Sequence, residues 1–245
     1  MKNNFARQGF GCSHIGLIRV VNEDCFLVDN KNGVYAVADG MGGLPYGEVA
    51  SQFSIEIITQ LIHDTVAGSD LSIEDWFEAV QHFVSEKGRQ IAPRSGIGTT
   101  LTVLRILENK QIQIGHCGDS AAYVIDSESI ERITPSHSSN KPTVQVQNPN
   151  TAHSTTSQAS KMPFEVLENY IGHPYPPVSF FKNLSIPDGS RVFLCTDGIF
   201  RYLDEAEILA IHRAQSKVKS FCESLIHTVN LRGGFDNATV VAFDQ

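Results

Sequence analysis

One stretch constrains this chain more than any other: an apolar run that ends on a carboxylate and a glycine-rich turn, YAVADGMGG at residues 35–43. Its first four residues are typical of a buried strand. The glycines that follow let the backbone turn sharply and approach a ligand closely. We therefore expect Asp39 to stand at the end of a strand, presented to a ligand and not buried.

Two further strand-like runs present an aspartate in a similar way. Residues 191–196 end on Asp197, and a turn that contains Asp236 opens the last strand, residues 238–243. Mg²⁺ and Mn²⁺ prefer oxygen ligands in octahedral geometry, so carboxylates at strand ends suit them. A single Asp beside a Gly is more often only a turn-former. The hypothesis of a metal site at Asp39, Asp197 and Asp236 therefore depends on all three together.

Length and charge limit the class of protein. A chain of 245 residues can form one domain with a large core. The net charge of -8, without a cluster of Lys and Arg, argues against a nucleic-acid or anionic-membrane partner. The first residues lack an apolar signal core and no run approaches the ~20 apolar residues of a membrane span, so we expect a cytoplasmic protein. We also expect a monomer. Five cysteines without a CxxC pair predict reduced thiols.

Hydrophobic periodicity predicts a mixture of helices and strands. Apolar residues at i, i+3 and i+4 indicate a helix over residues 47–66, and Ser72 with Asp75 forms a capping pair before a second helix. Asp204 with Glu207 forms another such pair, ahead of an apolar helical stripe at 218–229. Residues 25–28 and 33–38 predict a hairpin. Further segments are expected as a meander of strands (99–107, 111–117, 121–125, 129–133), a short helix (164–171) and two strands (178–184, 191–196).

Residues 136–161 differ from the rest of the chain. They are rich in Ser, Thr, Asn and Gln and carry few full charges. Such a segment cannot bury much apolar surface, so we expect a mobile loop. His116 precedes a Cys-Gly-Asp turn on a strand that reads as buried, which favours a hydrogen-bonded core histidine over a catalyst.

The acidic turns and their order resemble those of the PPM-type (type 2C) metal-dependent protein Ser/Thr phosphatases, in their compact bacterial form. The resemblance runs from about residue 10 to residue 243. A single motif such as Gly-Asp-Ser would be weak evidence, but several occur in family order. These motifs are Arg19 with Asn22-Glu23-Asp24, residues 39–43 with Gly47-Glu48, residues 98–100, residues 118–120, residues 196–198, and residues 234–237.

The resemblance implies an α+β fold, a β-sandwich of two antiparallel sheets flanked by helices, with a metal cluster at the sandwich edge. It implies one phosphatase domain over residues 1–245, with a variable flap-like loop at about 136–161. Its implied ligands hold two Mg²⁺ or Mn²⁺ ions and a third, weaker ion. Asp39 bridges the two ions, the Gly40 carbonyl binds one, Asp197 and Asp236 bind the other, Glu23 and Asp24 act mainly through waters, and Asp119 joins Asp197 at the third.

The implied function is hydrolysis of phosphoserine and phosphothreonine on proteins by a metal-activated water, opposing a bacterial Ser/Thr kinase, with Asp39, Asp197 and Asp236 catalytic. Arg19 matches the arginine that binds the substrate phosphate, a role that suits its planar fork of donors. Met41 and Leu44 stand where relatives carry His, so no general acid is implied, and Ala121 stands where an arginine is common. The alternative is a catalytically weak relative that binds or senses phosphoproteins.

Overall fold

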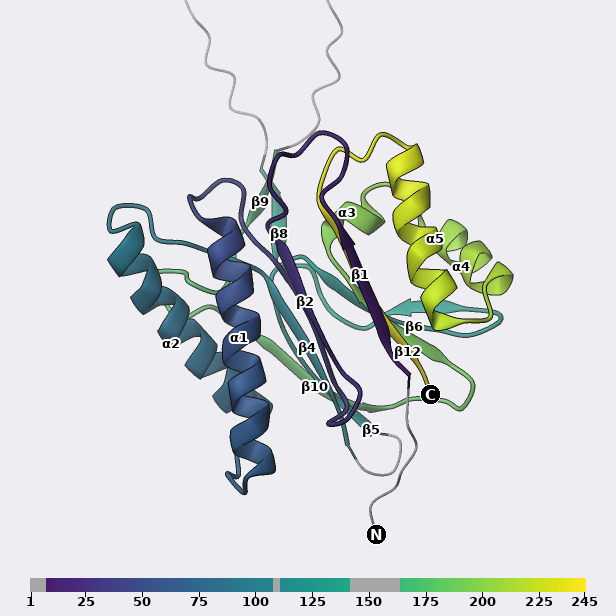
Figure 1. Cartoon of the computed structure of the whole chain (residues 1–245), viewed down its shortest axis with the longest axis horizontal. Helices are drawn as coiled ribbons and strands as arrows, with labels where there is room; N and C mark the ends of the chain where they lie inside the picture. Colours follow the sequence, from purple (N-terminus) through teal and green to yellow (C-terminus); the bar gives the residue numbers. More distant parts are fainter. Residues whose placement is uncertain (1–7, 108–110, 142–163) are drawn as a thin grey trace, which may run out of the picture.

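The computed structural model describes residues 8–107, 111–141 and 164–245 (Figure 1). Two five-stranded antiparallel sheets form a sandwich, and helices lie on the outer side of each sheet. This architecture confirms the predicted α+β fold. One sheet has the order β1 (Phe10–His14), β12 (Ala238–Asp244), β11 (Arg191–Cys195), β6 (Ala121–Ile125) and β7 (Ile130–Arg132). The other has the order β10 (Phe180–Ser185), β5 (Gln111–Cys117), β4 (Leu101–Ile106), β3 (Val34–Asp39) and β2 (Asp24–Asp29).

The β3 strand is buried on both faces, which explains its almost continuous apolar sequence. Side chains alternate between the two faces of a strand. Tyr35 and Val37 belong to the core between the sheets, where the Tyr35 ring stacks on Phe243 of β12 at a centroid distance of 4.6 Å. Ala36 and Ala38 face the helices instead. This double burial fixes the strand whose last residue is Asp39.

Two pairs of helices complete the outer layers. α1 (Gly47–Val66) and α2 (Ile73–Ile91) share a core with β2, β3 and β4, whereas α4 (Glu205–Ala214) and α5 (Val218–Leu231) cover the other sheet. Both predicted capping boxes form, at the starts of α2 and α4. A short helix, α3 (Asp197–Phe200), follows β11 directly. No helix within residues 8–107, 111–141 and 164–245 is long and apolar enough to cross a bilayer.

The predicted meander is wrong in its pairing. β4 and β5 pair with each other, and so do β6 and β7, but the two pairs belong to different sheets. The turn at residues 118–120 carries the chain from one sheet to the other, and Gly118 adopts a φ of 124° that other residues rarely reach. Sequence neighbours therefore separate at this turn, which bears Asp119.

The predicted short helix at 164–171 is also wrong. Its first residues form β9 (Phe164–Leu167), which pairs antiparallel with β8 (Ser138–Lys141), so that Ser139 lies opposite Val166. Pairing with a partner distant in sequence overrides a weak local helical pattern. The predicted mobile loop at 136–161 is therefore wrong at residues 138–141, which form β8, and its residues 142–161 lie outside the described residues.

Candidate active site

The predicted site residues gather at one end of the sandwich, uppermost in Figure 1, where β3, β5 and β11 end and β2 and β12 begin. Asp24 and Asp39 occupy directly opposite positions of the β2–β3 ladder. The turn after β3 is held against residue 23, because the Gly40 N–H donates to the Glu23 carbonyl at 3.0 Å. The hairpin thus places four predicted ligands, Glu23, Asp24, Asp39 and Gly40, side by side.

Thr100 holds the main chain of Asp39. The Asp39 N–H donates to the Thr100 hydroxyl at 3.0 Å, and the Thr100 N–H donates back to the Asp39 carbonyl at 2.8 Å. The same hydroxyl is hydrogen-bonded to Ser120 at 2.7 Å, next to Asp119. These contacts couple the end of β3 to the turn between the two sheets.

Asp24 is buried, and its two carboxyl oxygens are in different environments. Oδ2 accepts hydrogen bonds from the Thr196 hydroxyl at 2.9 Å and from the Thr239 hydroxyl at 2.7 Å. Oδ1 is buried and accepts no hydrogen bond from an N–H or hydroxyl group of the described residues, and the Asp39 carboxyl interacts with Asp24 in addition to the two threonines. A buried carboxyl oxygen without such a donor is costly. The Oδ1 atom therefore suits a cation or a water bound to one.

Asp197 begins α3 and is also buried. Arg201, one helical turn later, contacts its Oδ2 at 2.7 Å. The backbone at Gly198 lies so close to the Asn237 carbonyl that a Cβ would overlap with it. Glycine is therefore required where the loop after β11 meets the start of β12, which brings Asp197 toward Asp236.

Arg19 lies over Asp236 at the exposed side of the site. Its Nη2 atom is 2.9 Å from Asp236 Oδ1 and 3.0 Å from Oδ2, and its Nη1 atom is 3.9 Å from Glu23. Asn237 fixes the neighbouring backbone, because its Oδ1 accepts from the Glu23 N–H at 2.9 Å. Arg19 is partly exposed, so its donors can reach a ligand that enters from solvent.

Asp119 is positioned by residues that the sequence patterns did not indicate. Arg132 of β7 donates to the carbonyls of Asp119 and Ser120, at 3.0 and 3.4 Å. Gly118 donates to the His137 ring at 3.2 Å. His116 is buried and hydrogen-bonded to Thr102 at 2.8 Å, and burial lowers its pKa to about 3. It is a core histidine, as predicted.

The acidic side chains strongly affect one another. Asp39 is half-buried, so the expectation that it is not buried is wrong. Burial, followed by the charges of Asp24, Asp197, Asp119 and Asp236, raises the pKa of Asp39 well above its ordinary value. Burial raises the pKa of Asp24 to about 7, against the hydrogen bonds from Thr239 and Thr196. Burial and then the Asp119 charge raise the pKa of Asp197 to about 7, although Arg201 opposes this. Burial also raises the pKa of Glu23. The ionised cluster is thus unfavourable without a neutralising cation.

The donors fit a hard cation in chemical type. All the predicted side-chain ligands are carboxylates, and no N–H or hydroxyl group of the described residues donates to Asp24 Oδ1. Within the described part of the chain, however, no three His, Cys, Asp or Glu side chains are placed to hold one ion together. Two of the predicted ligands, Asp197 and Asp236, contact Arg201 and Arg19 instead. The fold therefore gathers the ligands in one region without bringing their oxygens to a common point.

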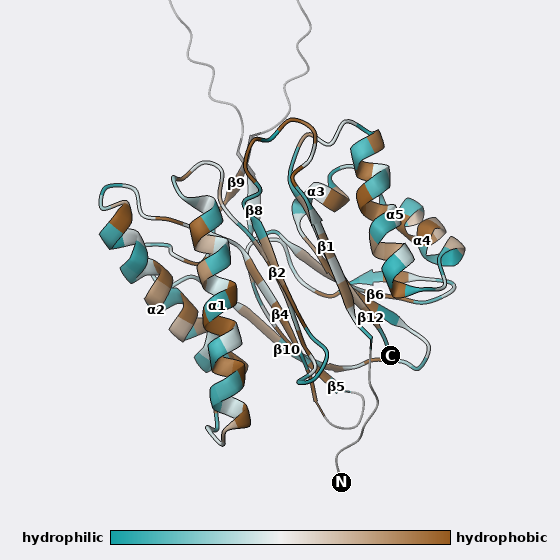
Figure 2. Cartoon of the chain, in the orientation of Figure 1, coloured by the Kyte–Doolittle hydropathy of each residue, from teal (hydrophilic) through white to brown (hydrophobic). Residues whose placement is uncertain are grey.

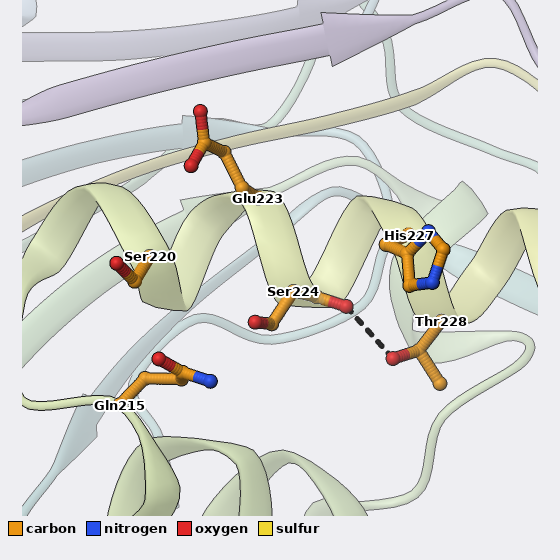
Figure 3. Close-up of a pocket in the computed structure, with 6 residues that line it drawn as sticks. All are labelled: Gln215, Ser220, Glu223, Ser224, His227 and Thr228. Carbon is orange, nitrogen blue, oxygen red and sulfur yellow. Dashed lines mark hydrogen bonds between the residues drawn. The ribbon is translucent and has the colours of Figure 1, made fainter.

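Neither of two surface hollows contains a predicted site residue. One, of about 380 Å³, lies along α5 and is shown in Figure 3, where the Thr228 hydroxyl donates to the Ser224 carbonyl of the same helix at 2.7 Å. The other, of about 400 Å³, lies between α2 and the Pro174–Pro176 turn. The residues that line the first are Gln215, Ser220, Glu223, Ser224, His227 and Thr228.

The chain belongs to the protein phosphatase 2C family, whose model matches residues 11–233. A serine/threonine phosphatase, stp, of Listeria innocua is 26% identical, over 94% of this chain and 92% of that protein. The crystal structure of the Mycobacterium tuberculosis serine/threonine phosphatase PstP/Ppp is 26% identical with a TM-score of 0.74, and the match covers 97% of this chain and 98% of that one. The catalytic domain of PstP in complex with two manganese ions matches with a TM-score of 0.73 at 24% identity, over 97% of each chain.

These findings confirm three predictions made from the sequence. They are the PPM family in its bacterial form, the β-sandwich fold, and an enzyme of the protein serine/threonine phosphatase class. The assignment of individual ligands and of the phosphate-binding arginine stays a prediction.

Proposed function

We propose that the chain hydrolyses phosphoserine and phosphothreonine on proteins with the help of Mg²⁺ or Mn²⁺, as a single phosphatase domain. The observation that carries this proposal is the group of mutually repelling carboxylates around Asp39, with no N–H or hydroxyl group of the described residues donating to Asp24 Oδ1 and with Arg19 at the exposed side. Such a group gains most from cations, and an arginine beside it suits a phosphate.

The proposed ligands follow from the positions described above. Asp39 and the Gly40 carbonyl would hold two ions together with Asp197 and Asp236, while Glu23 and Asp24 would act through waters. Two such cations, when bound, lower the pKa of a water and neutralise charge on the phosphoryl oxygens, so that phosphorus can be attacked in line. Asp119 would join Asp197 in a third, weaker site.

The chain's own residues prepare this chemistry. Thr196 and Thr239 hold Oδ2 of Asp24 and leave Oδ1 for a ligand. Arg19 offers a planar fork of donors that now contacts Asp236. A substrate phosphate can take over these donors and free the Asp236 carboxylate for a cation. Positioning and charge neutralisation are the main tasks of the protein in such a reaction.

Several finer points of the proposal concern the cellular context. We propose that the enzyme acts in the cytoplasm as a monomer and opposes a bacterial Ser/Thr kinase. The acidic charge without a basic groove disfavours a nucleic-acid phosphodiester as substrate. The presence of every predicted carboxylate in one region favours an enzyme over a phosphoprotein-binding relative without activity.

The test is phosphate release from a phosphothreonine peptide, with Mn²⁺ and again with EDTA. We expect release that EDTA abolishes. Asp39→Asn should reduce kcat by several orders of magnitude, whereas the control Asp70→Asn, at an exposed position after α1, should match the wild type. Release that persists in EDTA, or turnover of Asp39→Asn within about tenfold of wild type, would refute the proposal.

A further inference from the structure

Four apolar side chains flank Arg19 and project into solvent from the connection between β1 and β2. Leu17 is 63% exposed, Ile18 62%, Val20 92% and Val21 46%. Figure 2 shows the hydrophobic colour along this connection, at the end of the sandwich where the candidate site lies. Phe235, beside Asp236, is 55% exposed and adds a fifth apolar side chain. We call Leu17, Ile18, Val20, Val21 and Phe235 the apolar rim.

The backbone of this connection is fixed by hydrogen bonds to the loop before β12. Asn237 donates from Nδ2 to the carbonyls of Ile15 and Val21, at 2.9 and 3.0 Å. The Leu17 N–H donates to the Gly234 carbonyl at 2.6 Å. These hydrogen bonds keep the apolar side chains of the connection exposed to water, although folding normally buries apolar side chains. Grouped exposure of this kind marks an interaction site, whereas apolar residues exposed singly need no explanation.

The apolar rim is continuous with the candidate active site. Arg19 lies between Ile18 and Val20 in sequence, and its guanidinium contacts Asp236, the neighbour of Phe235. Phe235 is supported from the other side, because its ring stacks on Tyr202 at a centroid distance of 6.0 Å. A phosphate that reaches Arg19 therefore brings its neighbouring groups onto apolar side chains.

We propose that the apolar rim binds apolar side chains next to the phosphorylated residue of a protein substrate, an inference that rests on the proposed function. An extended peptide advances ~3.3 Å per residue, so the residues one or two places from a phosphoresidue at Arg19 lie above the rim. The positively charged guanidinium of Arg19, in the middle of the apolar rim, is complementary to the negative charge of a phosphorylated segment. A second copy of this chain would cover Arg19 and block the site, and the net charge of -8 opposes an anionic membrane.

The test compares two phosphothreonine peptides that differ only in the flanking residues, Leu and Val in one and Ser and Gly in the other. The measured quantity is the ratio of their kcat/KM values with Mn²⁺. Burial of about two methylene groups corresponds to roughly tenfold, so we expect the wild type to prefer the apolar peptide by about that factor. In the double variant Leu17→Ser, Val20→Ser the ratio should fall to near one.

The matched control is Val66→Ser, which changes an apolar residue that is 66% exposed at the far end of α1. It should keep the wild-type ratio. Equal kcat/KM values for the two peptides in the wild type, or an unchanged ratio in the double variant, would overturn the inference and leave the proposed function intact. A drop in the ratio for Val66→Ser as well would also overturn it.

A binding measurement separates this inference from the proposed function. The same peptides, labelled with a fluorophore, are titrated with the protein in EDTA and followed by anisotropy. Tighter binding of the apolar peptide that the double variant loses would support the rim even if neither peptide is hydrolysed with Mn²⁺, a result that would refute the proposed function alone. Equal binding of both peptides would count against the rim.

Discussion

Replacement of Asp39 by Asn should stabilise the metal-free protein while it removes catalytic activity. Asp39 lies opposite Asp24 in the β2–β3 ladder and is affected by the charges of Asp24, Asp197, Asp119 and Asp236. Asn has nearly the same shape, so the substitution removes the charge and little else. A residue that destabilises the metal-free fold is expected at a functional site that binds a cation.

The size of the effect can be worked out from the ladder. Two carboxylates on opposite residues, taken as ~5 Å apart at an effective dielectric constant of ~20, repel each other by about 3 kcal/mol. Partial protonation of Asp39 reduces this repulsion, because burial and the neighbouring carboxylates raise the pKa of Asp39 well above its ordinary value. We therefore expect a gain of about 2 kcal/mol at pH 8 for Asp39→Asn. In a chain of this length such a gain raises Tm by roughly 4 to 8 °C.

Thermal unfolding in EDTA and in Mn²⁺ provides the assay. In EDTA the Asp39→Asn variant should melt above the wild type. In Mn²⁺ the wild type should gain stability by binding the ion, whereas the variant should gain much less. Asp70→Asn, which removes an exposed charge, should change Tm little in either buffer. A variant that melts several degrees below the wild type in EDTA would refute the idea of a carboxylate cluster under repulsion.

Three further predictions concern the same region. In EDTA, Tm should fall as the pH rises from about 4 through about 7. The raised pKa values of Asp24 and Asp197 mean that the folded state binds more protons than the unfolded state in that range. A flat or rising Tm would contradict this prediction. Arg19→Ala should raise KM for a phosphopeptide more than it lowers kcat, since the contact to phosphate exists in ground and transition states alike; unchanged kinetics would make Arg19 structural. Asp119→Ala should shift the Mn²⁺ concentration needed for activity and leave tight binding of two ions in calorimetry; loss of all metal binding would contradict a third site.

The sequence predicted α1, α5 and the starts of α2 and α4 because the signals of these helices are local. The range of α1 agrees with the predicted residues 47–66, and both capping boxes form where a Ser or Asp stands three residues before an acidic side chain. The hairpin of β2 and β3 was predicted for the same reason. Each of these features is decided within a few residues.

The pairing of distant strands was not predictable in this way. Nothing near residues 118–120 indicates that β5 and β6 belong to different sheets, because that choice depends on which strands arrive from elsewhere in the chain. β9 was mistaken for a helix for a related reason. Its partner, β8, precedes it by a long interval of sequence, and pairing between the two outweighs the local pattern.

Asp39, Asp119 and Asp197 were predictable because each stands beside a glycine near the end of a strand. Asp236 was predictable because its glycine-containing turn opens the last strand. The residues that support them were not. Arg132 contacts the Asp119 carbonyl from another strand, and Thr239 is a single hydroxyl residue in a mostly apolar strand, where no motif marks it. Arg201 could have been found, because it follows Asp197 by one helical turn, where an ion pair is favourable.

The surroundings of Asp24 explain why the site needs both sheets. Asp24 belongs to β2 in one sheet, yet the two hydroxyls that hold its Oδ2 come from the other, since Thr196 follows β11 and Thr239 lies in β12. Thr196 is itself fixed to β12, because its hydroxyl accepts from the Thr239 N–H at 3.0 Å. The orientation of Oδ1 is therefore set by how the two sheets pack against each other. Aspartates on a single sheet would lack these two donors, which is why the site lies at the end of the sandwich, where strands of both sheets meet.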